Sequence, residues 1–345
     1  MIQNILFTCA GRRNYLIGYF KKALNENGLV IATDMQLSAP ALIEADMAFE
    51  TPSVYDKTYI PRLKEIIETY NVTAVISLND LELPILSKHK EELESSETRV
   101  LISNETAIDI SFDKWKTYKF IQKIGLNTPK TYLKIEEAKK AINDGILKFP
   151  VVIKPRWGSG SIGIEFPESL EELELALKLQ KIKLKRTILN TASSQDIDNA
   201  FLIQEILVGK EFGLDIVNDL EGEHFATFAR EKIAMRSGET DKAKSVINSA
   251  FEDAGKIIGN ALKHIGSMDI DVFLVNDKLY ILELNPRFGG GYPFSHKAGA
   301  DLASVYIDWL NGHNNEYVQR HINYREHVTF SKCDRLLQVF DKISE

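Results

Sequence analysis

Cysteine is scarce in this sequence, and its scarcity excludes several classes of protein. Only Cys9 and Cys333 occur among 345 residues, and no C-x-x-C spacing is present. Two cysteines are too few for a disulfide framework. The composition indicates no catalytic thiol and fits a reducing compartment, so we expect a cytoplasmic protein.

Long apolar runs and an excess of basic residues are also missing. No apolar run approaches the roughly 18 residues of a membrane-spanning helix, and Met1–Ala10 has no basic segment ahead of its short apolar run. The formal charge is −7 and the isoelectric point is about 5.7. We therefore expect neither a nucleic acid nor a membrane as partner. The content of 44% hydrophobic and 26% charged residues is ordinary for a globular chain long enough for two or three packed units.

Two glycine motifs for phosphate binding are absent as well. The first glycine turn, Ala10–Asn14, does not supply G-x-G-x-x-G, and the later loop Arg156–Gly163 does not supply G-x-x-x-x-G-K-[ST]. An enzyme that binds NAD through its N-terminal unit is therefore disfavoured.

The first hundred residues alternate between short apolar runs and helical periodicity. Asn4–Ala10, Leu29–Thr33 and Ala74–Ser77 are predicted strands, and Tyr15–Leu24 and Tyr59–Tyr70 are predicted helices. This alternation predicts a parallel sheet covered by helices.

Polar residues follow the predicted strands, at the edge where such sheets bind ligands. They include Arg12 and Arg13, Asp34, and the stretch Asn79–Glu82 with Asp80. The two arginines open a helix and could hold a carboxylate or phosphate, or they could be solvated turn residues. The sequence leaves these readings evenly balanced.

The stretch Ile281–Gly291 carries the strongest chemical signal in the chain. Glu283 and Asn285 alternate with apolar residues and should project from one face of a strand. Their oxygens suit Mg²⁺, and Arg287 after them offers a planar fork to phosphate. Taken alone, the stretch could also be an edge strand with a solvated face and a glycine turn.

A hairpin should bring a third oxygen ligand to this face. Asp269–Val275 and Lys278–Leu284 are predicted strands joined over an Asn-Asp turn. Asp271 then lies across from the strand that carries Glu283.

Two lysines occupy positions that favour an anion. Lys114 stands in the first turn of a predicted helix, where it opposes the helix dipole, although a surface lysine is the default explanation. Lys154 interrupts the buried-looking strand Phe149–Pro155 and needs an anion to justify its desolvation. The glycine loop after it could close over phosphates or be a plain turn.

These pieces, in this order, resemble the ATP-grasp superfamily, and within it carbamoyl-phosphate synthase large subunits and biotin carboxylases. The resemblance rests on Asp113-Lys114, Ile153-Lys154-Pro155, Gln204-Glu205-Ile206-Leu207 with Glu211, Asp271, and Glu283-Leu284-Asn285-Pro286-Arg287. It covers roughly residues 1 to 310, and the Glu-Leu-Asn-Pro-Arg motif is its most specific part. It implies an α/β protein with an N-terminal parallel-sheet domain at 1–105, a small grasp lobe at 106–200, a large lobe at 201–310 and a C-terminal appendage at 311–345.

The resemblance also implies roles for individual residues. Lys114 and Lys154 would bind ATP phosphates, Glu205 and Leu207 would present backbone groups to adenine, and Glu211 would meet the ribose. Arg287 and Lys154 would be catalytic. The implied nucleotide-binding set is Lys114, Lys154, Ser159, Gly160, Ser161, Gly163, Gln204, Glu205, Ile206, Leu207 and Glu211. The implied ligands of Mg²⁺, with Mn²⁺ as an alternative, are Asp271, Glu283 and Asn285, and Asp271 departs from the Gln or Glu common at that place.

The activity implied is that of an ATP-dependent carboxylate–amine ligase that works through an acyl phosphate and releases ADP and phosphate. Its partners would be a small-molecule carboxylate and amine, and a homodimer is a reasonable expectation. Candidate substrate residues are Arg12, Asp80, Arg230, Lys232, Arg236 and Glu239, with Arg236 for a carboxylate and Glu239 for a cationic amine. Alternatives are a regulatory nucleotide-binding module without turnover, and an ATP-dependent carboxylase or carbamoyl-phosphate synthase-like enzyme.

Overall fold

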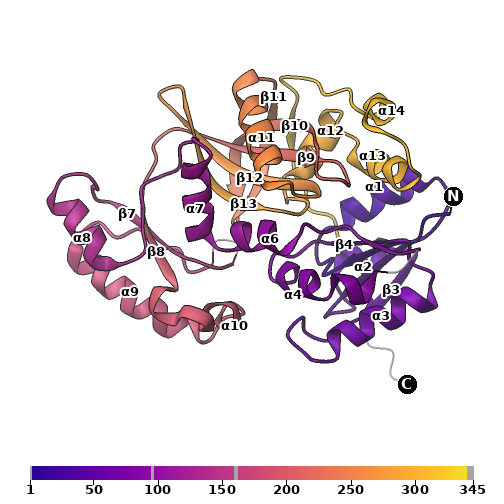
Figure 1. Cartoon of the computed structure of the whole chain (residues 1–345), viewed down its shortest axis with the longest axis horizontal. Coiled ribbons are helices and arrows are strands. Elements are labelled where there is room, and N and C mark those ends of the chain that lie inside the picture. The colour runs from indigo at the N-terminus through magenta and orange to yellow at the C-terminus, as the bar shows by residue number, and fades with distance from the viewer. Residues whose placement is uncertain (1, 95–96, 159–161, 340–345) are drawn as a thin grey trace.

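The computed structural model describes residues 2–94, 97–158 and 162–339. Within these ranges the strands form a five-stranded, a three-stranded and a six-stranded sheet. Figure 1 shows the five-stranded sheet at the lower right, the three-stranded sheet at the left and the six-stranded sheet above and between them. The chain thus builds one N-terminal domain and two further lobes.

The N-terminal domain is the parallel α/β unit that the sequence predicts. Its sheet has the order β3-β2-β1-β4-β5. All neighbouring strands in it are parallel. The strands are β1 (Ile5–Thr8), β2 (Val30–Asp34), β3 (Met47–Glu50), β4 (Ala74–Ser77) and β5 (Arg99–Val100), and the helices are α1 (Asn14–Leu24), α2 (Pro40–Glu44), α3 (Tyr59–Thr69), α4 (Leu83–Lys88) and α5 (Lys90–Leu93). Because parallel strands end at one edge, the polar residues after β1, β2 and β4 gather there.

Two helices lead from this domain to the lobes. They are α6 (Glu105–Phe112) and α7 (Lys114–Lys123). Asp113 separates them, and its carboxylate accepts hydrogen bonds from the Trp115 and Lys116 amides, which caps α7.

The small lobe is a three-stranded antiparallel sheet covered by helices. Its order is β6-β8-β7, from β6 (Thr131–Tyr132), β7 (Val151–Pro155) and β8 (Phe201–Glu205). The intervening chain forms α8 (Ile135–Asn143), α9 (Leu170–Leu184), α10 (Asn190–Ser193) and the 3-10 helix η1 (Ser194–Asn199). Since β8 pairs with β7 from Val151↔Glu205 to Pro155↔Phe201, the small lobe continues past the predicted boundary at residue 200.

The large lobe is an antiparallel sheet with α11 (Ser249–Leu262) packed on one face. Its order is β13-β12-β9-β10-β11-β14, from β9 (Lys210–Asn218), β10 (His224–Arg236), β11 (Glu239–Val246), β12 (Gly266–Val275), β13 (Lys278–Asn285) and β14 (Thr329–Ser331). Phe251, Ile258 and Leu262 of α11 join Ile270 and other strand residues in one apolar cluster. The opposite face of these strands is therefore left for polar side chains.

The chain after β13 returns to the N-terminal domain instead of forming a separate appendage. It contains α12 (Tyr292–Ala298), α13 (Leu302–Leu310), α14 (Asn315–Val318) and the 3-10 helix η2 (Gln319–His321) before β14. β14 pairs antiparallel with β11, so the predicted C-terminal appendage contributes a strand to the large sheet.

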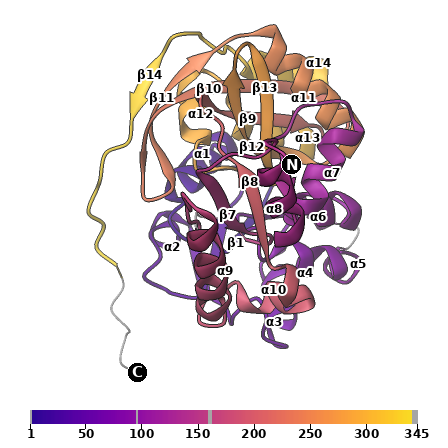
Figure 2. The same ribbon diagram turned by 90° about the vertical axis from the view of Figure 1, so that its left-hand side faces the viewer.

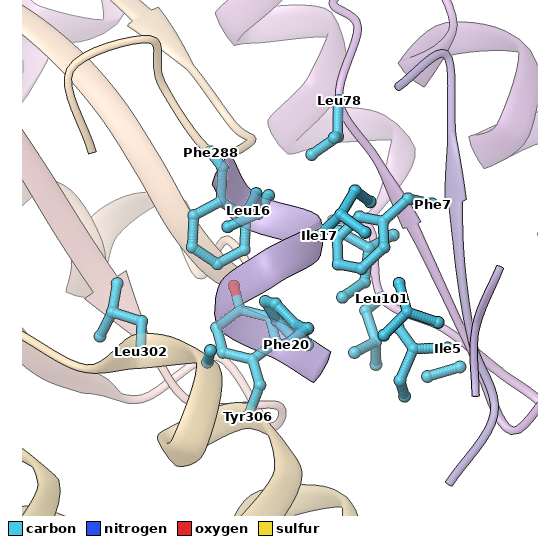
Figure 3. Packing of buried hydrophobic residues seen from close by; sticks show 14 of the residues in the cluster. Ile5, Phe7, Leu16, Ile17, Phe20, Leu78, Leu101, Phe288, Leu302 and Tyr306 are labelled. Atoms are coloured by element: carbon cyan, nitrogen blue, oxygen red, sulfur yellow. The ribbon is translucent and has the colours of Figure 1, made fainter. Parts of the chain in front are cut away.

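A shared apolar core fixes the large lobe on the N-terminal domain. Figure 3 shows α1 between Phe7 of β1 on one side and Phe288 and Tyr306 on the other. The Phe20 ring meets all three in edge-to-face contacts, with centroids 4.9 to 6.2 Å apart. Because Phe288 follows Arg287 directly, this packing fixes the arginine against the N-terminal domain.

No helix in the described part of the chain is both long enough and apolar enough to cross a membrane.

Candidate active site

A cavity of about 340 Å³ separates the small and large lobes, and we call it the interlobe cavity. It gathers, from six strands and α7, most of the residues predicted to bind nucleotide and metal. Its lining includes Lys114, Lys154, Gly158, Gln204, Glu205, Ile206, Leu207, Glu211, Lys232, Met235, Gly238, Asp271, Phe273, Leu282 and Glu283. Its size lies within the range of sites for small-molecule ligands.

The predicted hairpin of β12 and β13 places two carboxylates side by side in this cavity. Asn276 and Asp277 make the turn with φ of 48° and 61°, the left-handed region that Asn and Asp tolerate. Asp271 is then the cross-strand partner of Glu283. Ile270 and Leu284, which alternate with them, are buried on the side of α11.

Lys114 is held in the cavity by the geometry around the start of α7. Its backbone amide donates to the Arg156 carbonyl at 3.0 Å, and Asp113 accepts two hydrogen bonds from the Arg156 guanidinium at 2.8 and 2.7 Å. The Lys114 ammonium donates to the Gly158 carbonyl and lies 3.4 Å from Glu283. With its side chain 11% exposed, Lys114 is not a surface lysine, and these contacts compensate its position in the first helical turn.

Lys154 is nearly buried and short of negative charge. It stands on β7 at 8% exposure and forms no ion pair within 4.0 Å with any carboxylate of the described residues. Burial, together with the Lys114 charge, lowers its pKa to about 8 even though Glu283 acts in the opposite direction. An anionic ligand would relieve this deficit.

The two carboxylates of the hairpin have opposite electrostatic surroundings. Burial favours the protonated form of Glu283, but Lys114, Lys154 and Lys232 together lower its pKa to about 2. Burial raises the pKa of Asp271 to about 6, and the charges of Asp269 and Glu283 add to this while Lys232 opposes it. One lysine does not offset the burial and the neighbouring carboxylates of Asp271, and a divalent cation would add the missing stabilisation of its charged form.

Lys232, predicted as a substrate residue, lies in the interlobe cavity, where it bridges Glu211 of the predicted nucleotide site and the predicted metal ligand Asp271. Its ammonium lies 2.7 Å from Glu211 and 2.6 Å from Asp271, and its side chain is 5% exposed. These carboxylates raise its pKa despite burial. A bulge in β10 beside Lys232, together with the position of β9 between β10 and β12, makes the contact possible.

The donor set fits a magnesium ion bound together with phosphates. Three lysines and three carboxylates, Lys114, Lys154, Lys232, Glu211, Asp271 and Glu283, face one cavity. Phosphate oxygens can replace the carboxylates as partners of the lysines, which frees the carboxylates for a cation. The described residues contain no cluster of three or more His, Cys, Asp or Glu side chains that could hold a metal. Asp271, Glu283 and the Asn285 amide would thus supply few ligands, as is usual for Mg²⁺.

The strand β8 and the residues after it form the far wall of the cavity. The Glu205 amide already donates to the Lys130 carbonyl at 3.0 Å, and its side chain accepts from the Lys130 amide at 2.7 Å. The Leu207 amide donates to no described residue, so it remains available to a ligand.

The predicted phosphate loop is only partly described. Ser159, Gly160 and Ser161 lie outside the described residues. Gly158 has a φ of +114°, and a Cβ there would lie 2.5 Å from the Leu189 side chain, so only glycine fits. Gly163 faces Pro155 and Gln180 and is not part of the cavity lining.

Arg287 lies beyond the interlobe cavity, in an ion-pair network that reaches the N-terminal domain. Its guanidinium is 2.6 Å from Asp80 and 3.8 Å from Asp269, and its side chain is 8% exposed. Its Nε and the Asp80 Oδ1 are buried without a hydrogen-bond partner among the described residues. The predicted substrate residue Asp80 therefore contacts the predicted catalytic arginine.

Arg230 is a correction to the predicted substrate site. It is 1% exposed, and its terminal nitrogens lie 2.6 Å from Asp215 and 2.6 Å from Asp269. Gly213 and Gly291 approach it so closely that a Cβ on either would clash. A substrate cannot reach a side chain enclosed in this way, so Arg230 is structural.

Sequence reasoning missed Asp269, which links Arg230 to Arg287. The sequence contained a hint of this role, because Asp269 precedes Asp271 by two residues and so projects from the same face of the strand. In the structure Asp269 pairs with Asn285.

The remaining candidates line a second cavity, which we call the C-terminal cavity. Arg12, Arg236 and Glu239 meet there with residues 330–337 and Val339, and the volume is about 920 Å³. Arg236 is already paired with Asp334 at 2.7 Å and Asp241 at 3.0 Å, so the predicted carboxylate ligand is engaged by the chain itself.

The fold and the interlobe cavity define a chain with two β-lobes and, between them, a cavity lined by lysines and carboxylates. The chain belongs to the ATP-grasp family. The family model described as "ATP-grasp domain" matches residues 111–291, and the model "PylC-like, N-terminal domain" matches residues 5–101. The predicted family and fold class are confirmed.

Individual relatives agree with this assignment. The arginine-specific large chain of carbamoyl phosphate synthase from Bacillus subtilis is 26% identical over 218 residues, which are 60% of this chain and 20% of that one. The biotin carboxylase domain of Hydrogenobacter thermophilus 2-oxoglutarate carboxylase, solved with MgADP and bicarbonate, has a TM-score of 0.72 at 17% identity, over 94% of this chain and 73% of that one. An L-amino acid ligase from Bacillus licheniformis has a TM-score of 0.66 at 17% identity, over 95% and 78%. The chain spans about a fifth of the curated relative, and the structural likenesses show the fold.

Proposed function

We propose that the protein is an ATP-dependent carboxylate–amine ligase that uses Mg²⁺ and releases ADP and phosphate. The observation that carries this proposal is the position of Glu283. It lies near Lys114 and Lys154, which could bind phosphates, it pairs across the hairpin with Asp271, and its strand leads to Arg287. Mere nucleotide binding has little need of such a complete set of charges. The bound MgADP in one structural neighbour and the ligase name of another support the same reading.

In this proposal the residues of the interlobe cavity bind and orient ATP. The Leu207 amide and the Glu205 carbonyl face the base, Glu211 lies beside the ribose, and Lys114 and Lys154 take the phosphates. Mg²⁺, held by Asp271, Glu283 and Asn285, would neutralise phosphate charge. Catalysis in phosphoryl transfer is mostly such positioning and charge stabilisation.

Two displacements complete the reaction. A carboxylate oxygen attacks the γ-phosphorus, the bond to the β-phosphate oxygen breaks, and an acyl phosphate and ADP result. An uncharged amine then attacks the acyl carbon, the carbon–oxygen bond to phosphate breaks, and the amine loses a proton as the amide forms. Arg287 stands where the large lobe meets the N-terminal domain, and its positive charge would stabilise the transferring group.

The test is ADP and phosphate release with MgATP and small carboxylates and amines, offered singly and in pairs. We expect pair-dependent release that is lost in Glu283→Gln. Asp277→Asn is the matched control, because Asp277 is an exposed acid in the turn of the same hairpin. Release of AMP in place of ADP would contradict the proposal.

Two other outcomes distinguish the alternatives. Bicarbonate-dependent ADP release without an amine would indicate a carboxylase. No turnover with any pair, while MgATP raises the melting temperature, would favour a regulatory nucleotide-binding module.

A further inference from the structure

The C-terminal cavity adjoins the interlobe cavity through a common wall, the hairpin of β10 and β11. Met235 and Gly238 line the interlobe cavity, whereas Arg236, Ser237 and Glu239 line the C-terminal cavity. A Cβ on Gly290 would lie 2.9 Å from Arg13 and 3.4 Å from Glu239, so the glycine loop after Arg287 reaches the edge of the C-terminal cavity.

The C-terminal segment, residues 330–339, forms the outer wall of this cavity. β14 pairs with β11, the Lys332 amide donates to the Asp241 carbonyl at 2.8 Å, and the Lys332 ammonium lies 3.1 Å from Glu239. Asp334 is bound to Arg236, and Arg335 forms an ion pair with Glu44 of α2. Figure 2 shows this segment descending from β14 along the side of the molecule. It therefore joins the large lobe to the N-terminal domain.

The charges left over in the C-terminal cavity are positive. Each lining carboxylate is ion-paired: Glu239 with Arg13 and Lys332, and Asp241 and Asp334 with Arg236. Two lining cations, Arg12 and Lys297, have no carboxylate within ion-pair distance among the described residues. The Lys297 ammonium lies over the face of the Tyr19 ring, 5.8 Å from its centroid. Within the part of the chain that the structure describes, the cavity thus has two cations that form no ion pair and could bind an anionic group.

The rest of the lining is apolar. Aromatic and aliphatic side chains from α1, α12 and the C-terminal segment contribute to it: Tyr15, Tyr19, Phe294, Phe330, Leu336 and Leu337. Leu336 is 99% exposed, so the protein itself leaves this part of the wall uncovered. An apolar ligand body would gain contact area here.

We propose that the C-terminal cavity binds the amine substrate of the ligase, and that this substrate is an amino acid with an apolar side chain. This rests on the proposed function. Arg12 and Lys297 bind the carboxylate, the apolar wall takes the side chain, and the amine faces Glu239 and the loop after Arg287. The C-terminal segment is then part of the substrate site.

Cys333 provides a test that does not depend on turnover, because it lines the cavity and its side chain is exposed. Alkylation by iodoacetamide is followed by mass spectrometry, with and without MgATP, and Cys9 in the same sample is the internal reference. The probes are L-phenylalanine, L-leucine and L-methionine. At a concentration ten times its dissociation constant, a bound probe should slow alkylation of Cys333 about tenfold.

Controls isolate the two recognition elements. Phenethylamine lacks the carboxylate and glycine lacks the apolar body, so neither should protect Cys333. The double variant Arg12→Ala, Lys297→Ala should lose protection, whereas Arg62→Ala on α3, outside the cavity, should keep it. Failure of all three probes, equal protection by phenethylamine or glycine, or protection that persists in the double variant would overturn the inference.

The protection experiment and the ADP-release experiment test the amino-acid site and the ligase activity independently. Protection of Cys333 without ADP release from any pair would leave the amino-acid site standing and remove the ligase. Pair-dependent ADP release without protection would leave the ligase standing and remove this site.

Discussion

In the interlobe cavity most charged side chains stand within strands of two sheets and are half-buried or buried. In the C-terminal cavity they come mainly from the ends of β10, β11 and α12 and from the C-terminal segment, and most are exposed. Lys232 at 5% side-chain exposure and Asp334 at 72% mark the two extremes. Groups on packed strands hold their geometry before a ligand arrives, and groups on exposed segments acquire it on binding. The difference suggests a fixed site for the common cosubstrate beside an adaptable site for the variable one.

The same contrast between buried and exposed charges occurs along the single strand β10. It gives the largest change in stability that we expect from a substitution. Arg230 and Arg236 both lie on β10, but the first is buried between Asp215 and Asp269 and the second pairs with exposed acids. Arg230→Ala leaves buried carboxylates uncompensated and should lower the free energy of unfolding by about 3–5 kcal/mol. Arg236→Ala should cause no measurable change in urea unfolding. An equal loss of unfolding free energy in the two variants would show that the charged residues of the two regions do not differ in how much they stabilise the fold.

Glu283→Gln tests whether the buried acids carry the chemistry. Loss of the charge that faces Lys114 and Lys154 should reduce ADP release by about 100- to 1000-fold. The melting temperature should stay close to that of the wild type, and Asp277→Asn should retain full activity. A turnover rate of Glu283→Gln near that of the wild type would show that Glu283 is not needed for the reaction and that the interlobe cavity is not its site.

Asp80→Asn tests the bond between the N-terminal domain and Arg287. Without its 2.6 Å ion pair the arginine loses one of the two carboxylates that orient it, and kcat should fall about 10- to 100-fold. The KM for ATP should not change, because Asp80 is not part of the interlobe cavity, and Asp80→Glu should restore part of the rate. A raised KM for ATP with unchanged kcat would assign Asp80 to nucleotide binding.

The smallest effect is a pH dependence that only the interlobe cavity should show. Lys154 has a pKa of about 8, below its ordinary value, so it carries its charge below pH 8 and loses it above. MgATP affinity should therefore be about tenfold weaker at pH 9 than at pH 7. Lys154→Arg keeps the charge and should flatten the profile. Calorimetric titration at constant free Mg²⁺ measures this, and an equal slope in the arginine variant would exclude Lys154 as its cause.

The sequence predicts well those parts of the structure that depend on residues close together in the chain. Alternation along 281–285 placed Glu283 and Asn285, and the Asn-Asp turn predicted the hairpin that brings Asp271 to the strand of Glu283. The bulge between Asp271 and Val272, which makes Asp271 and Glu283 direct cross-strand partners, has no such local signal. The N-terminal sheet followed from the alternation of strands and helices. Lys114 and Lys154 stood out because each contradicts its local context.

The parts that it predicts poorly depend on contacts between distant strands. The roles of Arg230 and Lys232 require β9 to lie between β10 and β12, an order that no local pattern encodes. The three residues of β14 are too short and too polar to be recognised, and they pair with β11 across more than 80 residues of sequence, as in Lys242↔Ser331. The C-terminal segment therefore looked like an appendage.

The hairpin of β10 and β11 lies between the two cavities, because Met235 and Gly238 line the interlobe cavity and Arg236, Ser237 and Glu239 line the C-terminal cavity. A shift of this wall that enlarges one cavity changes the shape of the other. If nucleotide binding in the interlobe cavity raises the affinity of the C-terminal cavity for the amino acid by some factor, thermodynamic reciprocity requires the amino acid to raise the affinity for the nucleotide by the same factor. A shared wall of this kind would allow coupling between the two sites without any change in how the N-terminal domain and the two lobes are arranged.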